Sequence, residues 1–289
     1  MTKVEHARLG YQHIEVRPYS SAVGAELLGV DLSQPLDGHT WAEIRRAFHQ
    51  YLVLFFRDQT LSPEQHLSFA RRFGDLEPYP FVHGIAGYPE LIEIVKLPDE
   101  TRNFGCGWHT DMSYGEQPPL GAVLYGIEVP PLGGDTLFAN MYLAYETLSD
   151  GMKALVAKLK GLHDSREPED HSRMFKGMSM MGKKGMSRQV SAHPLVNTHP
   201  VTGRKSLYLS PTYCQQLVDM SIEESRPLLD YLERHAVQGA LTCRFRWEPG
   251  SVAVWDNRCT MHVAISDDLG ARLHGQGFRR VMRRATIRC

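Results

Sequence analysis

The chain has 289 residues, of which 42% are hydrophobic, and its 32 basic and 33 acidic residues give a formal net charge of −1. This balance argues against a nucleic-acid partner held by bulk charge, and a chain of this length can bury one large core as a single domain over residues 1–289. The longest apolar runs, such as Leu52–Phe56, are far too short to cross a bilayer, so we expect no membrane partner.

The first third of the sequence predicts helices and a strand in alternation. Thr40 and Glu43 have the spacing of a capping box, which predicts a helix that ends just before the apolar run Leu52–Phe56. That run predicts a buried strand. A second helix is predicted to begin at its cap, Ser62, and to end at Gly74.

From residue 91 onward, short segments rich in β-branched and aromatic residues predict strands. The predicted strands are Leu91–Leu97, Leu120–Val129, Thr136–Ala139, His193–Thr198, Ser206–Leu209, Leu241–Trp247, Ser251–Trp255 and Phe278–Ile287. The predicted helices between them are Tyr142–Leu148, Met152–Lys160 and Ile222–His235. Many short strands with turn residues between them predict a mainly β fold with flanking helices, a sandwich or barrel of the jelly-roll type that encloses a ligand cavity.

The segment of residues 164–191 differs from its surroundings, because it holds five methionines among lysines and glycines without a clean period. One interpretation is a mobile surface loop. The other is a lid insertion whose flexible methionine side chains pack on an apolar part of a substrate.

The pattern with the most chemical meaning is Trp108–Asp111, taken together with the distant His262. On a strand, residues i and i+2 project from the same face, so His109 and Asp111 would point the same way and His262 would arrive on a facing strand. Two imidazoles and one carboxylate on one face of a metal are the ligands of non-haem Fe(II) oxygenases. We therefore predict that His109, Asp111 and His262 are metal ligands and catalytic residues.

Two arginines in the predicted strand Phe278–Ile287 point to anion binding. Arg280 and Arg284 are four residues apart, so they share one face of a strand. Two guanidiniums turned into a barrel are costly to bury unless anions meet them. The alternative is a surface strand in a basic tail, because Arg279 and Arg283 lie beside them, but alternation predicts that those two face the opposite way.

Four segments together resemble one enzyme family. In order along the chain they are Trp108–Asp111, Gly133–Thr136, Trp255–Arg258 followed by His262, and Arg280–Thr286. They resemble the taurine dioxygenase (TauD/TfdA) family of Fe(II)- and 2-oxoglutarate-dependent dioxygenases. The resemblance runs from about Val23 to Ile287, and His193–Pro200 looks most like the aryloxyalkanoate dioxygenase branch. It implies a double-stranded β-helix, a barrel of the jelly-roll or cupin type.

The resemblance also implies roles for single residues. His109, Asp111 and His262 match the residues that bind Fe(II), while Thr136 and Arg280 match the pair that holds the distal carboxylate of the co-substrate 2-oxoglutarate. An arginine fork suits a carboxylate because it binds in a bidentate manner and keeps its charge.

Arg284, Tyr79 and Met112 are predicted to bind the substrate. Arg284 matches the arginine that holds the anionic end of the substrate. Tyr79 stands where the taurine enzyme has a histidine that helps bind the sulfonate, so taurine itself is not the expected substrate.

The activity implied is an O2-dependent hydroxylation of a small anionic molecule such as an aryloxyalkanoate, a sulfonate or a sulfate ester, with release of succinate and CO2. Two alternatives are a biosynthetic oxygenase acting on an amino-acid-like metabolite and a non-catalytic metal-binding cupin. Thr136 and Arg280 speak against the second, because a metal sensor needs no clamp for a keto acid. Family members commonly self-associate, so we expect a homo-oligomer. The five scattered cysteines, without a Cys-x-x-Cys pair, predict reduced thiols in a cytoplasmic protein.

Overall fold

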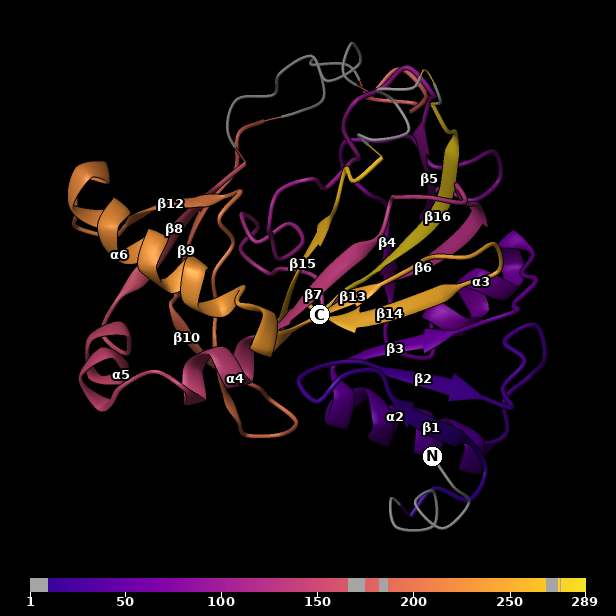
Figure 1. Ribbon diagram of the computed structural model, residues 1–289, viewed down its shortest axis with the longest axis horizontal. Coiled ribbons are helices and arrows are strands. Elements are labelled where there is room, and N and C mark those ends of the chain that lie inside the picture. Colours follow the sequence, from indigo (N-terminus) through magenta and orange to yellow (C-terminus); the bar gives the residue numbers. More distant parts are fainter. Residues whose placement is uncertain (1–9, 166–174, 182–186, 269–274, 276) are drawn as a thin grey trace.

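The computed structural model describes residues 10–165, 175–181, 187–268, 275 and 277–289. The strands of its largest sheet are β1 (Glu15–Pro18), β2 (Ala25–Leu28), β3 (Val53–Phe56), β4 (Leu76–Glu77), β5 (Leu91–Lys96), β6 (Gly121–Glu128), β14 (Val252–Asp256) and β16 (Arg280–Ile287). They pair in the order β1-β2-β3-β14-β6-β16-β4, and β5 pairs with β16 as well (Figure 1). Strands that are distant in the sequence are therefore neighbours at the centre of this sheet.

A second sheet faces the first across an apolar interior. Its strands, in the order β13-β7-β15, are β7 (Thr136–Asn140), β13 (Thr242–Phe245) and β15 (Thr260–Ala264). Phe55 of the large sheet and Phe245 of the small one belong to the same buried cluster, and their rings stack with centroids 4.0 Å apart. Burial of side chains of this size stabilises the fold by about 1.5–3 kcal/mol each. The space between the two sheets is where the site described below lies.

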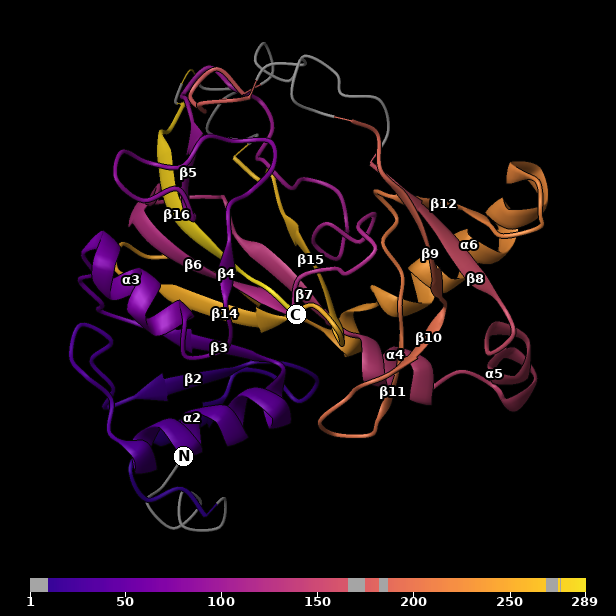
Figure 2. The same ribbon diagram turned by 180° about the vertical axis from the view of Figure 1, so that it is seen from behind.

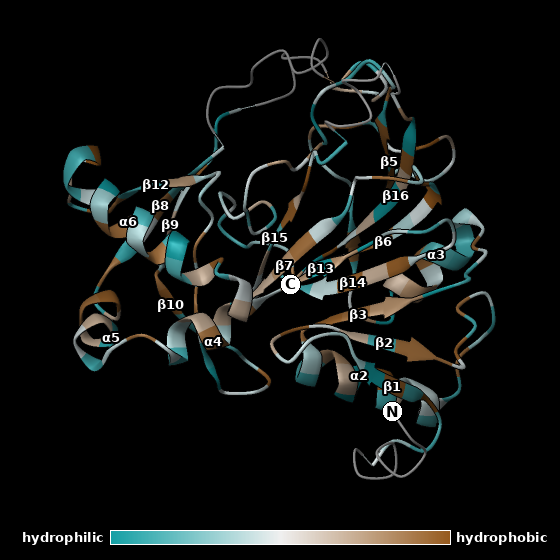
Figure 3. Cartoon of the chain, viewed as in Figure 1, coloured by the Kyte–Doolittle hydropathy of each residue, from teal (hydrophilic) through white to brown (hydrophobic). Residues whose placement is uncertain are grey.

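The outer face of the large sheet is covered by α2 (Gly38–Tyr51) and α3 (Pro63–Ala70). Alternation along β14 explains how one strand serves both layers, since Val254 packs with the helices while Trp255 packs in the interior between the sheets. Figure 3 shows β3 as hydrophobic along its length, as expected for a strand buried on both faces.

The two helix starts differ in how well the sequence predicts them. Ser62 caps α3 as predicted and forms a capping box with Gln65, although the helix ends at Ala70 rather than at Gly74. The box predicted for α2 is wrong: Asp37 is the cap, and its carboxylate accepts from the backbone N–H of His39 and of Thr40. The Glu43 carboxylate instead accepts three backbone N–H groups of residues 12–14, which ties the preceding segment to the helix.

The remaining elements form a part that Figure 2 shows beside the large sheet. They are α4 (Met141–Glu146), α5 (Asp150–Val156), β8 (Lys160–Asp164), β9 (Val190–Pro194), β10 (Val196–Thr198), β11 (Lys205–Leu207), β12 (Cys214–Leu217), α6 (Ile222–Ala236) and the 3-10 turn Gly239–Leu241. The single strand predicted over His193–Thr198 is interrupted at the buried Leu195. Ser221 and Glu224 form a capping box at the start of α6. Among the described residues, no helix is long and apolar enough to cross a membrane.

The predicted lid, residues 164–191, falls partly outside the described residues, at 166–174 and 182–186. In the part that is described, Phe175 and Met178 are buried in the interior cluster, and Met180 forms a β-bridge with Val82. Residues 175–181 therefore pack on the body of the molecule, and a lid role for the whole segment stays a prediction.

Candidate active site

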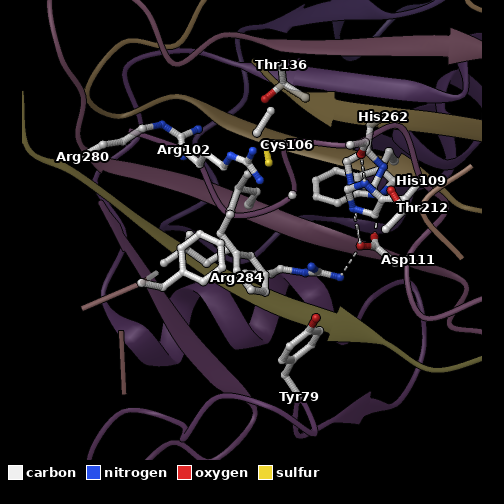
Figure 4. Close-up of a pocket in the computed structure, with 18 of the residues that line it drawn as sticks. Tyr79, Arg102, Cys106, His109, Asp111, Thr136, Thr212, His262, Arg280 and Arg284 are labelled. Carbon is white, nitrogen blue, oxygen red and sulfur yellow. Dashed lines mark hydrogen bonds and ion pairs between the residues drawn. The ribbon is translucent and has the colours of Figure 1, made fainter. Parts of the chain in front are cut away.

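Three side chains from distant positions meet between the two sheets. His109 and His262 are 7% exposed and Asp111 is 2% exposed. The Nε2 atoms of the two histidines each lie 3.6 Å from Oδ1 of Asp111, and Figure 4 shows both rings beside this carboxylate. One ligand atom from each residue lies within 4.8 Å of the others. The structure thus brings the three predicted ligands together.

The backbone that carries them departs from the prediction. His109 and Asp111 do not lie on a regular strand: His109 makes an isolated bridge with His262, in which each N–H donates to the other carbonyl at 3.0 and 2.9 Å. A turn follows at once, because Met112 has the left-handed φ of 46°. Before the bridge, Gly105 has a φ of 80°, and a Cβ there would lie 3.2 Å from Cε1 of His109. The positive φ and the close approach of the backbone to the His109 ring both favour glycine at this position.

Hydrogen bonds orient the ligand atoms toward one point. Nδ1 of His109 lies 2.7 Å from the carbonyl oxygen of Gly107 and must donate to it, which leaves the Nε2 lone pair facing Asp111. Trp255 donates from Nε1 to Oδ2 of Asp111 at 3.1 Å, which leaves Oδ1 facing the histidines. Burial lowers the pKa of His262 to about 3, so its imidazole is neutral near pH 7. Two imidazole nitrogens and one carboxylate oxygen form a donor set that fits a divalent cation.

The three groups stand in the wall of a cavity of about 370 Å³. Its polar lining also includes Arg102, Thr136, Arg280, Arg284 and the Tyr79 hydroxyl (Figure 4). Its apolar lining is Ile94, Phe104, Leu124, Phe175, Trp255 and Ala264. Met112 is not among the lining residues and packs, partly buried, against the interior cluster, so its predicted contact with substrate stays a prediction.

Arg280 and Thr136 share one part of this cavity. Trp247 donates from Nε1 to the Thr136 hydroxyl oxygen at 2.9 Å, which leaves the hydroxyl hydrogen able to donate elsewhere. Arg280 is buried, and its Nε has no hydrogen-bond partner among the described residues. Burial lowers its pKa to about 10, a change that Asp135 and Asp267 oppose. A buried guanidinium with an unused donor is a group that an anion would stabilise.

Arg284 lies next to the three converging side chains. Its Nη2 is 2.9 Å from Oδ1 of Asp111, and its guanidinium carbon lies 5.2 Å from the centre of the Tyr79 ring. Burial raises the pKa of Asp111, but Arg284 and the histidines outweigh this and hold the pKa well below its usual range. Burial raises the pKa of Tyr79 to about 12, so this phenol is a neutral hydrogen-bond donor near pH 7.

Alternation along β16 explains why only some of its arginines reach the cavity. Arg279 is exposed and pairs with Glu128, and Arg283 has Nη2 3.7 Å from a carboxylate oxygen of Glu93. Arg280 and Arg284 line the cavity, and Met282 between them packs in the interior. The predicted division of these arginines between two faces is therefore confirmed.

A second group of the same residue types lies elsewhere: His49, His199 and Asp256. Both oxygens of Asp256 are already bound, since Arg258 donates to Oδ1 from Nε at 2.8 Å and to Oδ2 from Nη2 at 2.6 Å. His199 donates from Nε2 to Oδ2 at 3.0 Å. This group is a closed network of ion pairs and hydrogen bonds.

Several residues that support the site were not predicted from the sequence. Asn257 Oδ1 accepts from Trp255 Nε1 at 3.0 Å, so it supports the tryptophan that holds Asp111. The clearest omission is Trp247, which holds Thr136. Its place at the end of the predicted strand Leu241–Trp247 was the available signal, because an aromatic donor next to turn residues is typical of a buried anchor.

Known proteins resemble this chain over nearly all of its length. Residues 15–286 match the taurine catabolism dioxygenase TauD, TfdA family. An alpha-ketoglutarate-dependent sulfate ester dioxygenase of Pseudomonas putida is 31% identical over 95% of this chain and 89% of its own. A (S)-phenoxypropionate/alpha-ketoglutarate-dioxygenase of Sphingobium herbicidovorans is 32% identical over 88% of this chain and 90% of its own.

Solved structures agree with these relatives. A taurine dioxygenase from Burkholderia xenovorans superposes with a TM-score of 0.79 at 37% identity, covering 96% of this chain and 91% of its own. The structure of AAD-2 in complex with Mn(II) and N-oxalylglycine gives a TM-score of 0.76 at 30% identity, covering 96% and 98%. The mainly β fold with few helices is thus shared with these enzymes. On these matches, the chain belongs to the taurine catabolism dioxygenase TauD, TfdA family.

Proposed function

We propose that this protein is an Fe(II)- and 2-oxoglutarate-dependent dioxygenase that hydroxylates a small anionic organic substrate. The observation that carries the proposal is the convergence of His109, Asp111 and His262 in the wall of a cavity that also holds two buried guanidiniums. As the frame for this site we propose one domain with a double-stranded β-helix, on the support of the two facing sheets.

Fe(II) would be held by Nε2 of His109, Nε2 of His262 and Oδ1 of Asp111. These atoms are buried and face one another, and the lowered pKa values of His262 and Asp111 leave both of these groups unprotonated near neutral pH. A metal with three protein ligands on one face keeps its other positions open toward the cavity, where a co-substrate and oxygen must enter.

Arg280 and Thr136 would hold the distal carboxylate of 2-oxoglutarate. The free Nε donor of Arg280 and the available hydroxyl hydrogen of Thr136 are the groups that a carboxylate needs. A charge-assisted hydrogen bond of this kind contributes on the order of 1.5–3 kcal/mol. This clamp also separates the proposal from a non-catalytic metal-binding cupin, which has no use for it.

Arg284 and Tyr79 would hold the anionic end of the substrate beside the metal. The relatives that act on sulfate esters and on phenoxypropionate support a substrate that is an anion. When bound, the iron and 2-oxoglutarate together reduce O2, so that one oxygen atom enters succinate with loss of CO2 and the other converts a substrate C–H into C–OH. The protein's residues position the C–H and limit access of water. A hydroxyl placed on a carbon that carries an ester or ether oxygen gives a product that fragments.

The first test is addition of Fe(II) and 2-oxoglutarate in the absence of oxygen, monitored for the visible charge-transfer colour. We expect colour in the natural protein and none in Asp111→Ala, and an uncoloured natural protein overturns the proposal. A panel of sulfonates, sulfate esters, aryloxyalkanoates and amino acids, scored by succinate release in air, then ranks the substrates. A homo-oligomer and a cytoplasmic location stay predictions, which sedimentation and cell fractionation would test.

A further inference from the structure

The cavity has a strongly one-sided charge. Among the residues that the structure describes, three of the lining side chains are guanidiniums, those of Arg102, Arg280 and Arg284, whereas Asp111 is the one carboxylate. Asp111 already faces Arg284 at 2.9 Å and both proposed histidine ligands at 3.6 Å. A cationic group on a bound molecule would therefore meet like charges and find no free carboxylate among the described lining residues to pair with it.

Arg102 extends this charge toward solvent. It is exposed, it lines the cavity, and it makes no hydrogen bond or ion pair with any of the residues that the structure describes. An uncompensated guanidinium at a cavity wall attracts anions from solution and repels cations. The charge that an incoming molecule meets first thus has the same sign as the charge deep in the cavity.

A row of aromatic rings leads away from the proposed head site. The Tyr79 ring lies under the Arg284 guanidinium, at 5.2 Å. Phe104 contacts Tyr79 edge-on with ring centroids 6.1 Å apart, and Phe175 contacts Phe104 in the same manner at 5.3 Å. All three aromatic residues line the cavity. We define Tyr79, Phe104 and Phe175 as the aromatic row.

Aliphatic side chains of the large sheet complete this apolar surface. Ile94 of β5 and Leu124 of β6 line the same cavity and are nearly buried. In a molecule whose anion is bound by Arg284, the tail would contact this apolar surface. Burial there is favourable for an apolar tail and unfavourable for a charged one. A tail of two carbons is shorter than the 6.1 Å between the ring centroids of Tyr79 and Phe104, so it would not contact the rest of the aromatic row.

We infer that the substrate is an organic anion with an apolar tail longer than two carbons and without an ammonium group. The inference rests on the proposed function, because it takes Arg284 beside the metal as the head site. It favours alkyl or aryl sulfonates, sulfate esters and aryloxy acids over amino acids, amino-acid-like metabolites and taurine. The aromatic row is the feature that selects the tail.

A matched pair of ligands tests the charge directly. Taurine and 1-propanesulfonate have the same sulfonate head and equally long tails, but an ammonium in the first is a methyl in the second. Binding to the enzyme loaded with Fe(II) and 2-oxoglutarate is measured by calorimetry without oxygen. We expect 1-propanesulfonate to bind at least about tenfold more tightly than taurine, and 1-hexanesulfonate more tightly again. Equal or tighter binding of taurine overturns the inference.

A variant of the aromatic row tests the location of the tail. Phe104→Asp places a carboxylate in the row, so we expect it to weaken binding of 1-hexanesulfonate by about tenfold or more and to narrow the preference over taurine. Phe104→Leu is the matched control, since it keeps an apolar side chain and is expected to retain the preference. If Phe104→Asp leaves both affinities unchanged, the tail does not lie on the row and the inference is overturned.

The colour formed with Fe(II) and 2-oxoglutarate before any substrate is added distinguishes a failure of the inference from a failure of the proposed function. Colour in the natural protein and in both variants, together with a preference for taurine, overturns the inference and leaves the proposed function standing. A natural protein without colour overturns the proposed function and the inference with it. Colour in each variant also shows that the variant is folded around its metal site.

Discussion

Among the residues that the structure describes, two clusters each contain two histidines and one aspartate, and they differ in what their carboxylates do. In the first, Oδ1 of Asp111 faces two histidine Nε2 atoms and Nη2 of Arg284, and Trp255 donates to the other oxygen. In the second, Arg258 binds both oxygens of Asp256, and His199 adds a further hydrogen bond. The same residue types thus line a cavity in one place and form an internal network of ion pairs and hydrogen bonds in the other.

The imidazole nitrogens, rather than the residue composition, distinguish the two clusters: Nε2 of His109 and Nε2 of His262 both face Oδ1 of Asp111 at 3.6 Å, whereas Nε2 of His199 donates to an oxygen of Asp256 that Arg258 also binds. A cation needs ligand atoms that no protein donor has taken. The first cluster also lines the cavity of about 370 Å³, whereas none of the residues of the second cluster lines it. The predictions below are ways to test this contrast.

The largest effect is expected at the open cluster. Asp111→Ala removes the only carboxylate ligand and should lower both Fe(II) affinity and succinate release by more than the roughly 10–100-fold cost of losing a residue that merely orients a ligand. Metal content after dialysis and succinate assays measure this. The aspartate is not a ligand if the variant retains iron and coupled turnover.

An intermediate effect is expected at the tryptophan that orients this carboxylate. Trp255→Phe keeps the ring volume but removes the N–H that donates to Oδ2 of Asp111. We expect Fe(II) affinity to fall by about 10–100-fold, with a smaller change in the unfolding midpoint than in metal binding. Iron titration and thermal denaturation of the metal-free protein distinguish the two, and an unchanged iron affinity would contradict the assigned role.

At the closed cluster, the expected effect is on stability alone. Asp256→Asn leaves the Arg258 guanidinium without its anion, and we expect unfolding free energy to fall by about 2 kcal/mol, below the roughly 3–5 kcal/mol typical of a fully buried pair because Arg258 reaches solvent. Urea denaturation measures this. Fe(II) affinity should stay the same, and a parallel loss of iron would make the second cluster a metal site after all.

His66, a buried histidine outside both clusters, should make the stability of the fold depend on pH. His66 donates from Nε2 to the carbonyl oxygen of Val123 at 3.1 Å, and burial lowers its pKa to about 4. Because the folded-state pKa lies below the unfolded value, protonation favours unfolding, and stability is lost as the pH falls below about 6.5. This group alone should make the protein about 2 kcal/mol less stable at pH 5 than at pH 8.

His66→Gln retains a donor for the Val123 carbonyl but cannot titrate. The difference in unfolding free energy between pH 5 and pH 8 should shrink by that amount, as measured by urea denaturation at both values. A pH dependence that is the same in the natural protein and the variant would show that folding does not change the pKa of His66.

The sequence predicted the elements and ligands whose signals are local or strictly alternating. The Ser62 and Ser221 caps depend on residues three apart, and the inward arginines of β16 depend on a period of two. The turn after His109 could not be predicted, because nothing local marks Met112 as left-handed. The same holds for α2, where Glu43 is used by residues 12–14 across a tertiary contact rather than by its own helix.

Partners of the site residues were beyond prediction for a related reason. That Trp247 holds Thr136, and that Arg258 fills Asp256 so that it cannot serve a metal, depends on which hydrogen bonds form after the chain has folded. The residue types could be read from the sequence, but which of their atoms take part in hydrogen bonds could not.

The reciprocal backbone bond between His109 and His262 has a consequence for how the protein is made. Two proposed ligands are joined through main-chain atoms of β15 and of a loop that is synthesised far earlier, and the arginines follow on β16, which inserts between strands translated before it. A nascent chain can therefore capture its cation only after these late strands have docked. Iron uptake would then report that β15 and β16 have docked, and a chain without these strands in place would carry no reactive metal.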